Sequence, residues 1–279
     1  MKLSIITVNY NNAEGLNHTL RSVEMQSCLE FEHIIIDGGS SDESIGIIEE
    51  YEARIDSLRA DESWDYPFVS WVSERDGGIY DAMNKGVGKA SGDYLYFLNS
   101  GDMLASPTVL KEMVDLLDGT DCVIGRVILT RNGQVEGQTA LLSEKDMSMY
   151  HMYLHGINHQ SALIKRDLLL NTPYDIRVKM SADWKFFVQA IVLDGASAKF
   201  VDLFFANYDL SGISSDTQAI IRERESLLDI LLPERIARDY QIIAPHYYEI
   251  VRVEWLLHHP FWYKIYRALT TIGRKIERL

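Results

Sequence analysis

The sequence predicts an α/β protein, in which a mostly parallel central sheet is flanked by helices and is followed by a helical C-terminal extension. Two observations carry this prediction. Apolar, β-branched runs alternate four times with segments of helical spacing in about the first hundred of the 279 residues, which is typical of a parallel sheet covered on both faces. From Asp216 onwards the apolar residues keep helical spacing over most of the remaining chain.

The elements of the first half follow from local patterns. Lys2–Val8 is a compact β-branched run, and Glu14–Gln26 places apolar side chains on one face of a helix. Further strands are expected at 31–36, 70–72 and 93–98, and further helices at 44–58 and 79–90. Because parallel strands end at the same edge of a sheet, the turns that follow these strands are expected to lie together.

The alternation changes beyond Asp102. A helix is expected over Pro107–Leu117, with Ser106 as its N-cap, and Ala182–Val192 is apolar enough to form a buried helix. Strands are expected at 122–130, 159–164 and 198–210, with a hairpin turn at 132–133. No change of composition forces a domain boundary before about residue 215, so we expect one domain over 1–215 and an extension over 216–279.

Composition excludes some classes of function. The net charge of −14 argues against general nucleic-acid binding, which needs a basic surface. Cys28 and Cys122 are too few for a disulfide scaffold and lack metal-type spacing, which favours a reduced, cytoplasmic setting. The short apolar run at the N-terminus leads straight into asparagines, so it is interpreted as a first strand and not as a signal peptide. No stretch approaches the ~18–20 apolar residues that cross a bilayer.

Short polar turns follow the four strands at the expected carboxyl edge. They are TVNY at 7–10, DGGSSD at 37–42, ERDGG at 74–78 and NSGD at 99–102. Turn chemistry alone explains any one of them. Together they gather several carboxylates and an arginine at one edge, and carboxylates packed so closely require a cation or a metal–polyphosphate complex. The sequence therefore predicts a ligand site there.

The motifs SIITVNYNN, IIIDGGSSD, SERDGGIYDAMNKG and GDYLYFLNSGD, in this order, resemble the inverting family 2 glycosyltransferases with a GT-A fold. The resemblance is greatest to bacterial members that build exopolysaccharides and lipid-linked oligosaccharides, including the colanic-acid type. It covers roughly Met1 to Ser215. It implies a Rossmann-like GT-A catalytic domain over 1–215, with a nucleotide-binding half at about 1–105 and an acceptor half at about 106–215.

The same resemblance implies a nucleotide-diphosphate-sugar donor, a divalent metal (Mn²⁺ or Mg²⁺) and a single-displacement transfer. Uracil is the expected base because it is the most frequent in the family. The residues that the resemblance places at the nucleotide are Thr7, Asn9, Tyr10, Asp37, Ser40, Ser41, Asp42, Arg75, Asp76, Asn84, Lys85, Asn99 and Ser100. Of these, Asp37 is expected to hydrogen-bond the base and Arg75 to lie close to the phosphates.

The turn FLNSGD stands where the family has an acidic run of Asp-x-Asp type. Asp102 matches the last acid of that run, so the resemblance makes it the ligand of a metal that bridges the two phosphates. Asn99 replaces the first acid. An amide brings no charge, although it can hydrogen-bond a ribose hydroxyl or offer a carbonyl oxygen, and a weak or donor-dependent metal site is therefore expected.

An inverting transfer needs a carboxylate that deprotonates the acceptor hydroxyl. KMSADWKFF resembles the family segment whose last acid is the catalytic base, which makes Asp183 the expected base; the alternative is an ordinary acid at a helix N-terminus. Partial burial near Trp184 is expected to raise the pKa of Asp183. The resemblance places four residues at the acceptor or the donor sugar: His159, Gln160, Trp184 and Ser214. Ser214 belongs to a Gly-Ser loop that either closes over the diphosphate or only connects to the C-terminal helices.

The last twenty residues carry five basic side chains and one acid. Their apolar residues from Phe261 to Leu279 recur on one helix face, flanked by aromatic residues, which is typical of an interfacial helix on an anionic membrane. Such a helix would suit a polyprenyl-linked acceptor at the inner face of the cytoplasmic membrane. The alternative is a helix that docks on its own domain or on a second subunit, as in a homodimer.

The sequence thus predicts a hexosyltransferase-type enzyme that moves a sugar from a nucleotide donor, with inversion, to a hydroxyl of a glycan or lipid-linked glycan in bacterial surface-polysaccharide synthesis. Two alternatives remain. A sugar nucleotidyltransferase is opposed by TVNYNNAEG, which has no basic residue to meet a triphosphate. A degenerate, non-catalytic nucleotide-sugar-binding protein is favoured by Asn99 and opposed by the presence of Asp183.

Overall fold

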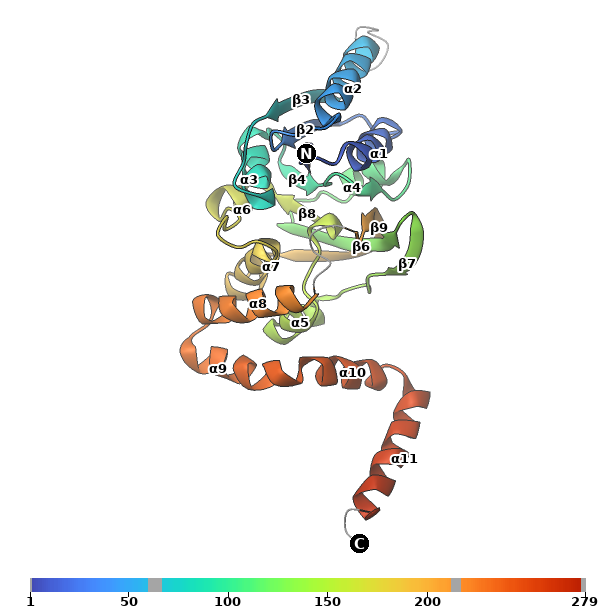
Figure 1. Ribbon diagram of the computed structural model, residues 1–279, viewed down its shortest axis with the longest axis vertical. Helices are drawn as coiled ribbons and strands as arrows, with labels where there is room; N and C mark the ends of the chain where they lie inside the picture. Colours follow the sequence, from blue (N-terminus) through green and yellow to red (C-terminus); the bar gives the residue numbers. More distant parts are fainter. Residues whose placement is uncertain (1, 60–66, 212–216, 277–279) are drawn as a thin grey trace. The chain divides into compact units, whose positions relative to one another are not determined.

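The computed structural model describes residues 2–59, 67–211 and 217–276 (Figure 1). The chain separates into two compact units, Met1–Arg224 and Glu225–Leu279. Every predicted site residue that the structure describes belongs to the first unit.

One mixed sheet forms the centre of the first unit. Its strands are β1 (Leu3–Asn9), β2 (Phe31–Asp37), β3 (Phe68–Ser73), β4 (Tyr94–Phe97), β5 (Met103–Leu104), β6 (Cys122–Arg131), β7 (Gln134–Gln138), β8 (Ala162–Lys165) and β9 (Ala198–Asp209). Their order is β3-β2-β1-β4-β8-β6-β9-β5, and β7 pairs with β6. The strands β1 to β4 are parallel, whereas β8 is antiparallel to both β4 and β6. The predicted α/β fold, with its parallel first half, is confirmed.

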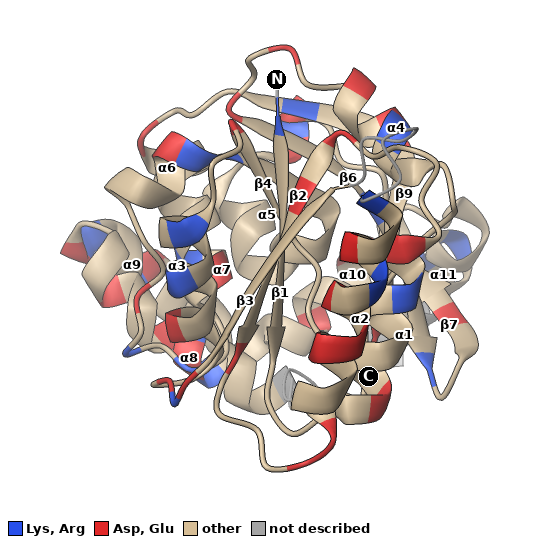
Figure 2. Ribbon diagram, turned by 90° about the horizontal axis from the view of Figure 1, so that it is seen from above, with Lys and Arg blue, Asp and Glu red and all other residues tan. Residues whose placement is uncertain are grey.

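Helices cover both faces of this sheet. The first unit contains α1 (Ala13–Glu24), α2 (Ser44–Arg59), α3 (Ile79–Lys89), α4 (Val109–Asp115), α5 (Met149–Leu154), α6 (Arg166–Asn171), α7 (Ala182–Phe187) and the start of α8 (Thr217–Leu231). Figure 2 shows α1, α2 and α4 on one side of the central strands and α3 and α6 on the other. Alternate side chains of β1 pack against the helices on opposite faces of the sheet. Leu3 and Ile5 belong to the apolar cluster that contains residues of α4, whereas Ile6 packs against Gly86 of α3.

A buried polar chain lies on the α2 side of the sheet. The hydroxyl of Thr7 lies 2.9 Å from Nε2 of His33, and His33 Nδ1 lies 3.0 Å from the Tyr51 hydroxyl. Burial lowers the pKa of His33 to about 3, so the ring is neutral. Thr7 is wholly buried, because residues 3, 5 and 7 of β1 point to the same face. The side chain of Thr7 therefore faces the core, and its expected place beside a nucleotide stays a prediction.

Three predicted elements differ in detail. The α4 helix begins at Val109 with Thr108 as its N-cap, because Ser106 Oγ accepts the Thr108 N–H in a turn ahead of the helix. The helix expected to start at Ala182 is helical to Leu193, but it changes from α to π geometry at Val188. Residues 159–161 form a 3₁₀ turn, η2 (His159–Ser161), rather than the start of a strand.

The second unit is helical, as the sequence predicts. It contains the end of α8, α9 (Glu234–Ile243), α10 (Tyr247–Leu257) and α11 (Pro260–Ile276). Several of its large apolar side chains are exposed, namely Ile230, Ile236, Ile242, Tyr248, Val253, Trp255, Leu257, Phe261, Trp262, Ile265 and Tyr266. Over the part of the chain that the structure describes, no helix combines the length and the apolarity that a bilayer span requires.

Candidate active site

The turn after β2 is organised by Asp37. Oδ1 of this carboxylate accepts hydrogen bonds from Asn9 Nδ2 and Ser40 Oγ, and Oδ2 accepts from the backbone of Gly39 and Ser40 and from Ser73 Oγ. Burial raises its pKa, but these hydrogen bonds outweigh burial and lower it on balance. Asp37 is 0% exposed and saturated with donors. It holds the turn, and its expected hydrogen bond to a base stays a prediction.

The rest of this turn connects the first two helices. Asp42 accepts from the backbone N–H of Ala13 and of Ser44, so it links the N-termini of α1 and α2. Ser40 Oγ accepts from the N–H of Asn11, and the Ser41 N–H donates to the side chain of that asparagine. The nucleotide contacts expected of Ser40, Ser41 and Asp42 stay predictions.

An open surface lies beside this turn. The Tyr10 side chain is 64% exposed, and a Cβ on Gly38 would lie 3.2 Å from its ring and 2.7 Å from Asp76 Oδ2. The ring and the carboxylate therefore come together over Gly38, where only a hydrogen fits. Arg75 is exposed next to them. These three predicted nucleotide residues gather at the carboxyl ends of β1, β2 and β3.

Two residues of α3 are engaged within the protein. The Asn84 side chain donates to the carbonyl of Tyr174 and accepts the N–H of the same residue, at 2.8 and 3.0 Å. Both ends of the amide are used within the protein, and the expected position of Asn84 near the donor stays a prediction. Lys85 Nζ lies 2.9 Å from Glu74 Oε1, and this hydrogen bond raises the pKa of Lys85. A role of Lys85 at the nucleotide stays a prediction.

The NSGD turn after β4 is held from α1. Thr19 Oγ1 accepts the Gly101 N–H at 3.0 Å and donates to the carbonyl of Asp102 at 2.7 Å. Asn12 Nδ2 donates to the carbonyl of Ser100. Gly101 has φ of +106°, a left-handed conformation that glycine adopts without strain. The polar residues are therefore an ordered turn fixed by a buried hydroxyl.

Asp102 points into the protein. It is 4% exposed, and its two oxygens accept from Gln160 Nε2 and from the Asp209 N–H at 2.9 and 3.0 Å. Burial raises the pKa of Asp102 to about 6. Gln160 is equally enclosed, at 4% exposed. The two side chains bond to each other below the surface. The metal ligation expected of Asp102 and the sugar contact expected of Gln160 stay predictions.

The sequence reading missed Asp209, which ends β9. Its carboxylate accepts from the N–H and the hydroxyl of Ser211, and its Oδ2 would lie 3.8 Å from a Cβ on Gly101. In the described residues no group of three or more His, Cys, Asp or Glu side chains is arranged to hold a metal. Mg²⁺ commonly takes one or two carboxylates and completes its shell with phosphates and water. A single acid at Asp209 fits a metal held in this way.

Asp183 is held by groups from two distant segments. Its side chain is 16% exposed; Oδ2 accepts from His159 Nδ1 at 2.9 Å and Oδ1 accepts from the Tyr80 hydroxyl at 3.0 Å. Oδ1 also accepts the N–H of Trp184. Burial raises the pKa of Asp183, but the hydrogen bond from His159, the charge of that ring when it is protonated, and the hydrogen bonds from Trp184 and Tyr80 outweigh burial and lower the pKa on balance. The expected upward shift is wrong, and the carboxylate is ionised at neutral pH.

Tyr80 was also missed. Burial and the neighbouring Asp183 charge raise the pKa of this phenol well above its usual value, so Tyr80 remains a donor. It lies one residue into α3, directly after Gly77 and Gly78. The only local signal was its place behind a glycine turn at the carboxyl edge of β3.

Two of the four expected sugar-contacting residues remain to be placed. Trp184 is 0% exposed; its indole N–H donates to the carbonyl of Met152, and the Arg224 guanidinium covers its ring. The sugar contact expected of Trp184 stays a prediction. Ser214 lies outside the described residues.

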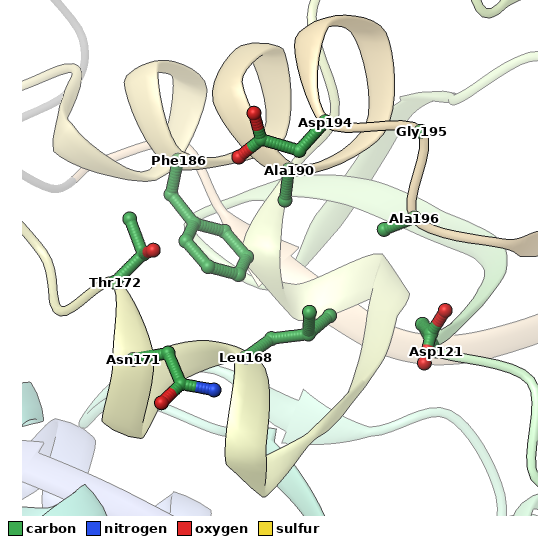
Figure 3. Close-up of a pocket in the computed structure, with 9 residues that line it drawn as sticks. All are labelled: Asp121, Leu168, Asn171, Thr172, Phe186, Ala190, Asp194, Gly195 and Ala196. Carbon is green, nitrogen blue, oxygen red and sulfur yellow. The ribbon is translucent and has the colours of Figure 1, made fainter.

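A pocket of about 360 Å³ lies elsewhere in the first unit (Figure 3). Its walls come from the residue before β6, from α6, from α7 and from the segment that follows α7, including Asp121, Asn171, Phe186 and Asp194. None of the predicted site residues lines it. The candidate site is instead the more open surface at the strand ends.

The chain is similar in sequence and in fold to known proteins. An uncharacterised glycosyltransferase of Mycobacterium tuberculosis is 30% identical over 221 residues, 76% of this chain and 77% of the relative. The fold resembles S. aureus TarS 1–349 in complex with UDP-GlcNAc, with a TM-score of 0.61, 20% identity, and coverage of 85% of this chain and 69% of that one.

A second fold neighbour contains a metal. It is glucosyl-3-phosphoglycerate synthase of Mycobacterium tuberculosis in complex with Mn²⁺, UDP and glucosyl-3-phosphoglycerate, with a TM-score of 0.54 and 14% identity over 84% of this chain and 81% of that one. These likenesses show a GT-A fold. The model of glycosyl transferase family 2 matches residues 4–177, which include β1 to β4 and the turns of the site. The chain therefore belongs to glycosyl transferase family 2 and is a glycosyltransferase.

Proposed function

We propose that the protein is an inverting glycosyltransferase that moves a sugar from a nucleotide diphosphate, with uridine as the expected nucleoside, to a hydroxyl of a glycan or lipid-linked glycan. The observation that carries the proposal is the ionised Asp183 carboxylate, partly exposed and fixed by His159 and Tyr80. A carboxylate so held has the charge and the orientation that a general base requires.

Asp183 would act on the acceptor hydroxyl. As the acceptor oxygen attacks the anomeric carbon, its proton passes to a carboxylate oxygen of Asp183. The bond between the anomeric carbon and the diphosphate breaks, and its electron pair leaves with the phosphate oxygen. Attack from the face opposite the leaving group inverts the anomeric centre. Tyr80 and His159 would hold the carboxylate in place while the proton is transferred.

The nucleotide would lie on the open surface formed by Tyr10, Asp76 and Arg75. The exposed Tyr10 ring offers an apolar face to a base, and the Asp76 carboxylate offers acceptors to ribose hydroxyls. Arg75 is exposed at the same place and would meet the diphosphate. Asp37 supports this surface from below through its five hydrogen bonds.

A divalent metal would neutralise the charge that develops on the leaving diphosphate. Asp209 would hold it, because this carboxylate is partly exposed and lies at the NSGD turn, beside Gly101. Asp102 is only 4% exposed, so Asp209 is the more accessible of the two carboxylates.

Calorimetric titration with UDP, GDP and dTDP, each with Mn²⁺ and with EDTA, tests this proposal. We expect one nucleotide to bind, more tightly with Mn²⁺, and we expect Asp209→Asn to remove most of the gain from Mn²⁺ but not the binding in EDTA. Asp202→Asn, which lies on the same strand and pairs with Arg126, is the matched control. Failure of the folded protein to bind any of the three nucleotides would overturn the proposal.

The two alternatives lose support. The family match concerns glycosyltransferases, and the segment TVNYNNAEG has no basic residue to meet a triphosphate, which opposes a nucleotidyltransferase. Asp183 with its fixed hydrogen bonds opposes a degenerate binding protein.

We also propose that α11 contacts the inner face of the cytoplasmic membrane. Phe261 and Trp262 are 68% and 51% exposed, and Lys264 is exposed between them and Ile265. Full-length protein is expected to co-sediment with vesicles that contain phosphatidylglycerol. The double variant Phe261→Glu with Trp262→Glu should bind at least ~10-fold less tightly, because two aromatic side chains lose their apolar burial. Vesicles of pure phosphatidylcholine are the control. Equal binding of both proteins would contradict the proposal.

A further inference from the structure

We infer that Asn99 is a positioning residue that couples the donor to the base: its side-chain amide accepts a donor hydroxyl through Oδ1 and fixes the protonation state of His159 through Nδ2. The proposed function supplies only the role of Asp183 as base. The hydrogen-bond chain from Asn99 to Asp183 is a feature of the structure itself.

The chain runs across the His159 ring. Nε2 of the ring lies 3.0 Å from Asn99 Nδ2, and Nδ1 lies 2.9 Å from Asp183 Oδ2. The 3₁₀ turn η2 places the ring at the end of β4, edge-on to Phe97. His159 is only 8% exposed, so its two ring nitrogens depend on these partners.

The partners decide where the ring proton lies. An amide nitrogen only donates, so Nε2 of His159 must accept from Asn99. The ionised carboxylate of Asp183 only accepts, so Nδ1 must carry the proton. His159 is then neutral, with its single N–H directed at the base. A neutral ring orients Asp183 without neutralising its charge, which leaves the carboxylate free to take a proton.

The other end of the amide points to a ligand. Asn99 Oδ1 is buried and has no hydrogen-bond partner in the part of the chain that the structure describes. An unpaired buried acceptor is unfavourable, and a hydroxyl donor from a ribose or a sugar would satisfy it. Because Oδ1 and Nδ2 belong to one rigid amide, a hydroxyl at Oδ1 keeps Nδ2 directed at His159. Donor binding would thus stabilise the tautomer that serves the base.

An aspartate at this position would have the opposite effect. Its carboxylate only accepts, so it would require a proton on Nε2 and convert His159 to an imidazolium between two carboxylates. The added positive charge would lower the pKa of Asp183 further, and each unit of that decrease would slow proton removal by up to about tenfold. In this inference Asn99 has a function of its own, because it keeps His159 neutral as an aspartate could not.

Nitrogen-15 NMR of the histidine rings in the full-length protein at pH 7.5 tests the inference. We expect His159, assigned with His159→Gln, to be neutral with the proton on Nδ1. Asn99→Asp should convert it to the doubly protonated ring. Asn99→Ala, which removes the amide, should leave the proton on Nδ1, because Asp183 still accepts it, and should allow Nε2 to be protonated in part of the molecules. His33, a buried neutral ring with its own partners, is the internal control and should not change if the variants fold.

Kinetics supply the second measurement. Asn99→Asp should lower kcat for hydrolysis of the donor that binds, and Asn99→Ala should raise KM for that donor. A His159 ring that is doubly protonated, or protonated on Nε2, in the unmodified protein would overturn the inference. The two proposals fail separately. If the His159 signals are as expected but no donor is hydrolysed, the hydrogen-bond chain is supported and only the proposed function is contradicted. Hydrolysis with the wrong tautomer would count against Asn99 alone.

Discussion

Replacing Asp183 with asparagine is expected to lower the rates of donor hydrolysis and of sugar transfer by roughly 10²–10⁴-fold, the usual contribution of a general base. An amide cannot take a proton from the acceptor, whereas its oxygen still accepts from Tyr80. The affinity for the nucleotide is expected to stay within a factor of about two. Asp183 forms no hydrogen bond with Tyr10, Arg75 or Asp76, the residues of the proposed nucleotide surface. The loss should therefore appear in kcat and not in nucleotide binding.

The measurement is release of nucleoside diphosphate from the donor that binds in the calorimetric titration. Asp194→Asn is the matched control, because Asp194 follows the same helical segment and bonds only Gln189 among the side chains of the described residues. Since the pKa of Asp183 is lowered, the base is ionised throughout the neutral range. The rate should therefore fall with acid only below the usual carboxylate pKa of about 4. An Asp183→Asn variant with full activity would exclude this carboxylate as the base.

Replacing Asp37 with alanine is expected to lower the free energy of unfolding by about 3–5 kcal/mol, the usual cost of removing one member of a buried, charged hydrogen-bond network. Asn9, Ser40 and Ser73 would each lose the acceptor that they now share. Losses of this size lower the melting temperature by roughly 10 °C in a domain of this length. Urea unfolding followed by circular dichroism provides the measurement.

Asp37→Asn separates the structural role from a role in binding. The amide keeps the shape and one acceptor, so its stability should lie between those of the unmodified protein and Asp37→Ala. Asp202→Asn, at an exposed ion pair, should change stability by less than about 1 kcal/mol. If Asp37→Ala were as stable as the unmodified protein but no longer bound nucleotide, direct contact with the base would be the better explanation.

The fold could be predicted because its first half repeats a simple pattern. β1 and β2 are β-branched runs bounded by turn residues, and the structure places their ends within one or two residues of the predicted ones. The prediction was less accurate where the backbone changes type. The polar residues His159–Ser161 form a 3₁₀ turn ahead of the apolar strand β8. The helix from Ala182 widens to π geometry inside an apolar run, without any proline or glycine.

The location of the site could be predicted from the sequence, but only some of its side-chain contacts could be. Strand order brings the four turns together, and this follows from sequence. Which way each side chain points does not. The alternation of side chains along β1 places Thr7 in the core. The Asn84 side chain bonds the backbone of a residue 90 positions away. Tyr80 reaches Asp183 across 103 residues. Such pairings depend on tertiary packing, which no local pattern in a single sequence reports.

The left-handed backbone at Gly101 has a consequence for an acid at this position. An acid introduced there would have to adopt a strained conformation, and it would lie beside the Asp209 carboxylate, since a Cβ on Gly101 already comes within 3.8 Å of that oxygen. The two acids would repel each other unless a cation lay between them. With the proposed metal at Asp209, an acid at 101 would become a second ligand, so its repulsion by Asp209 should appear only when the metal is removed.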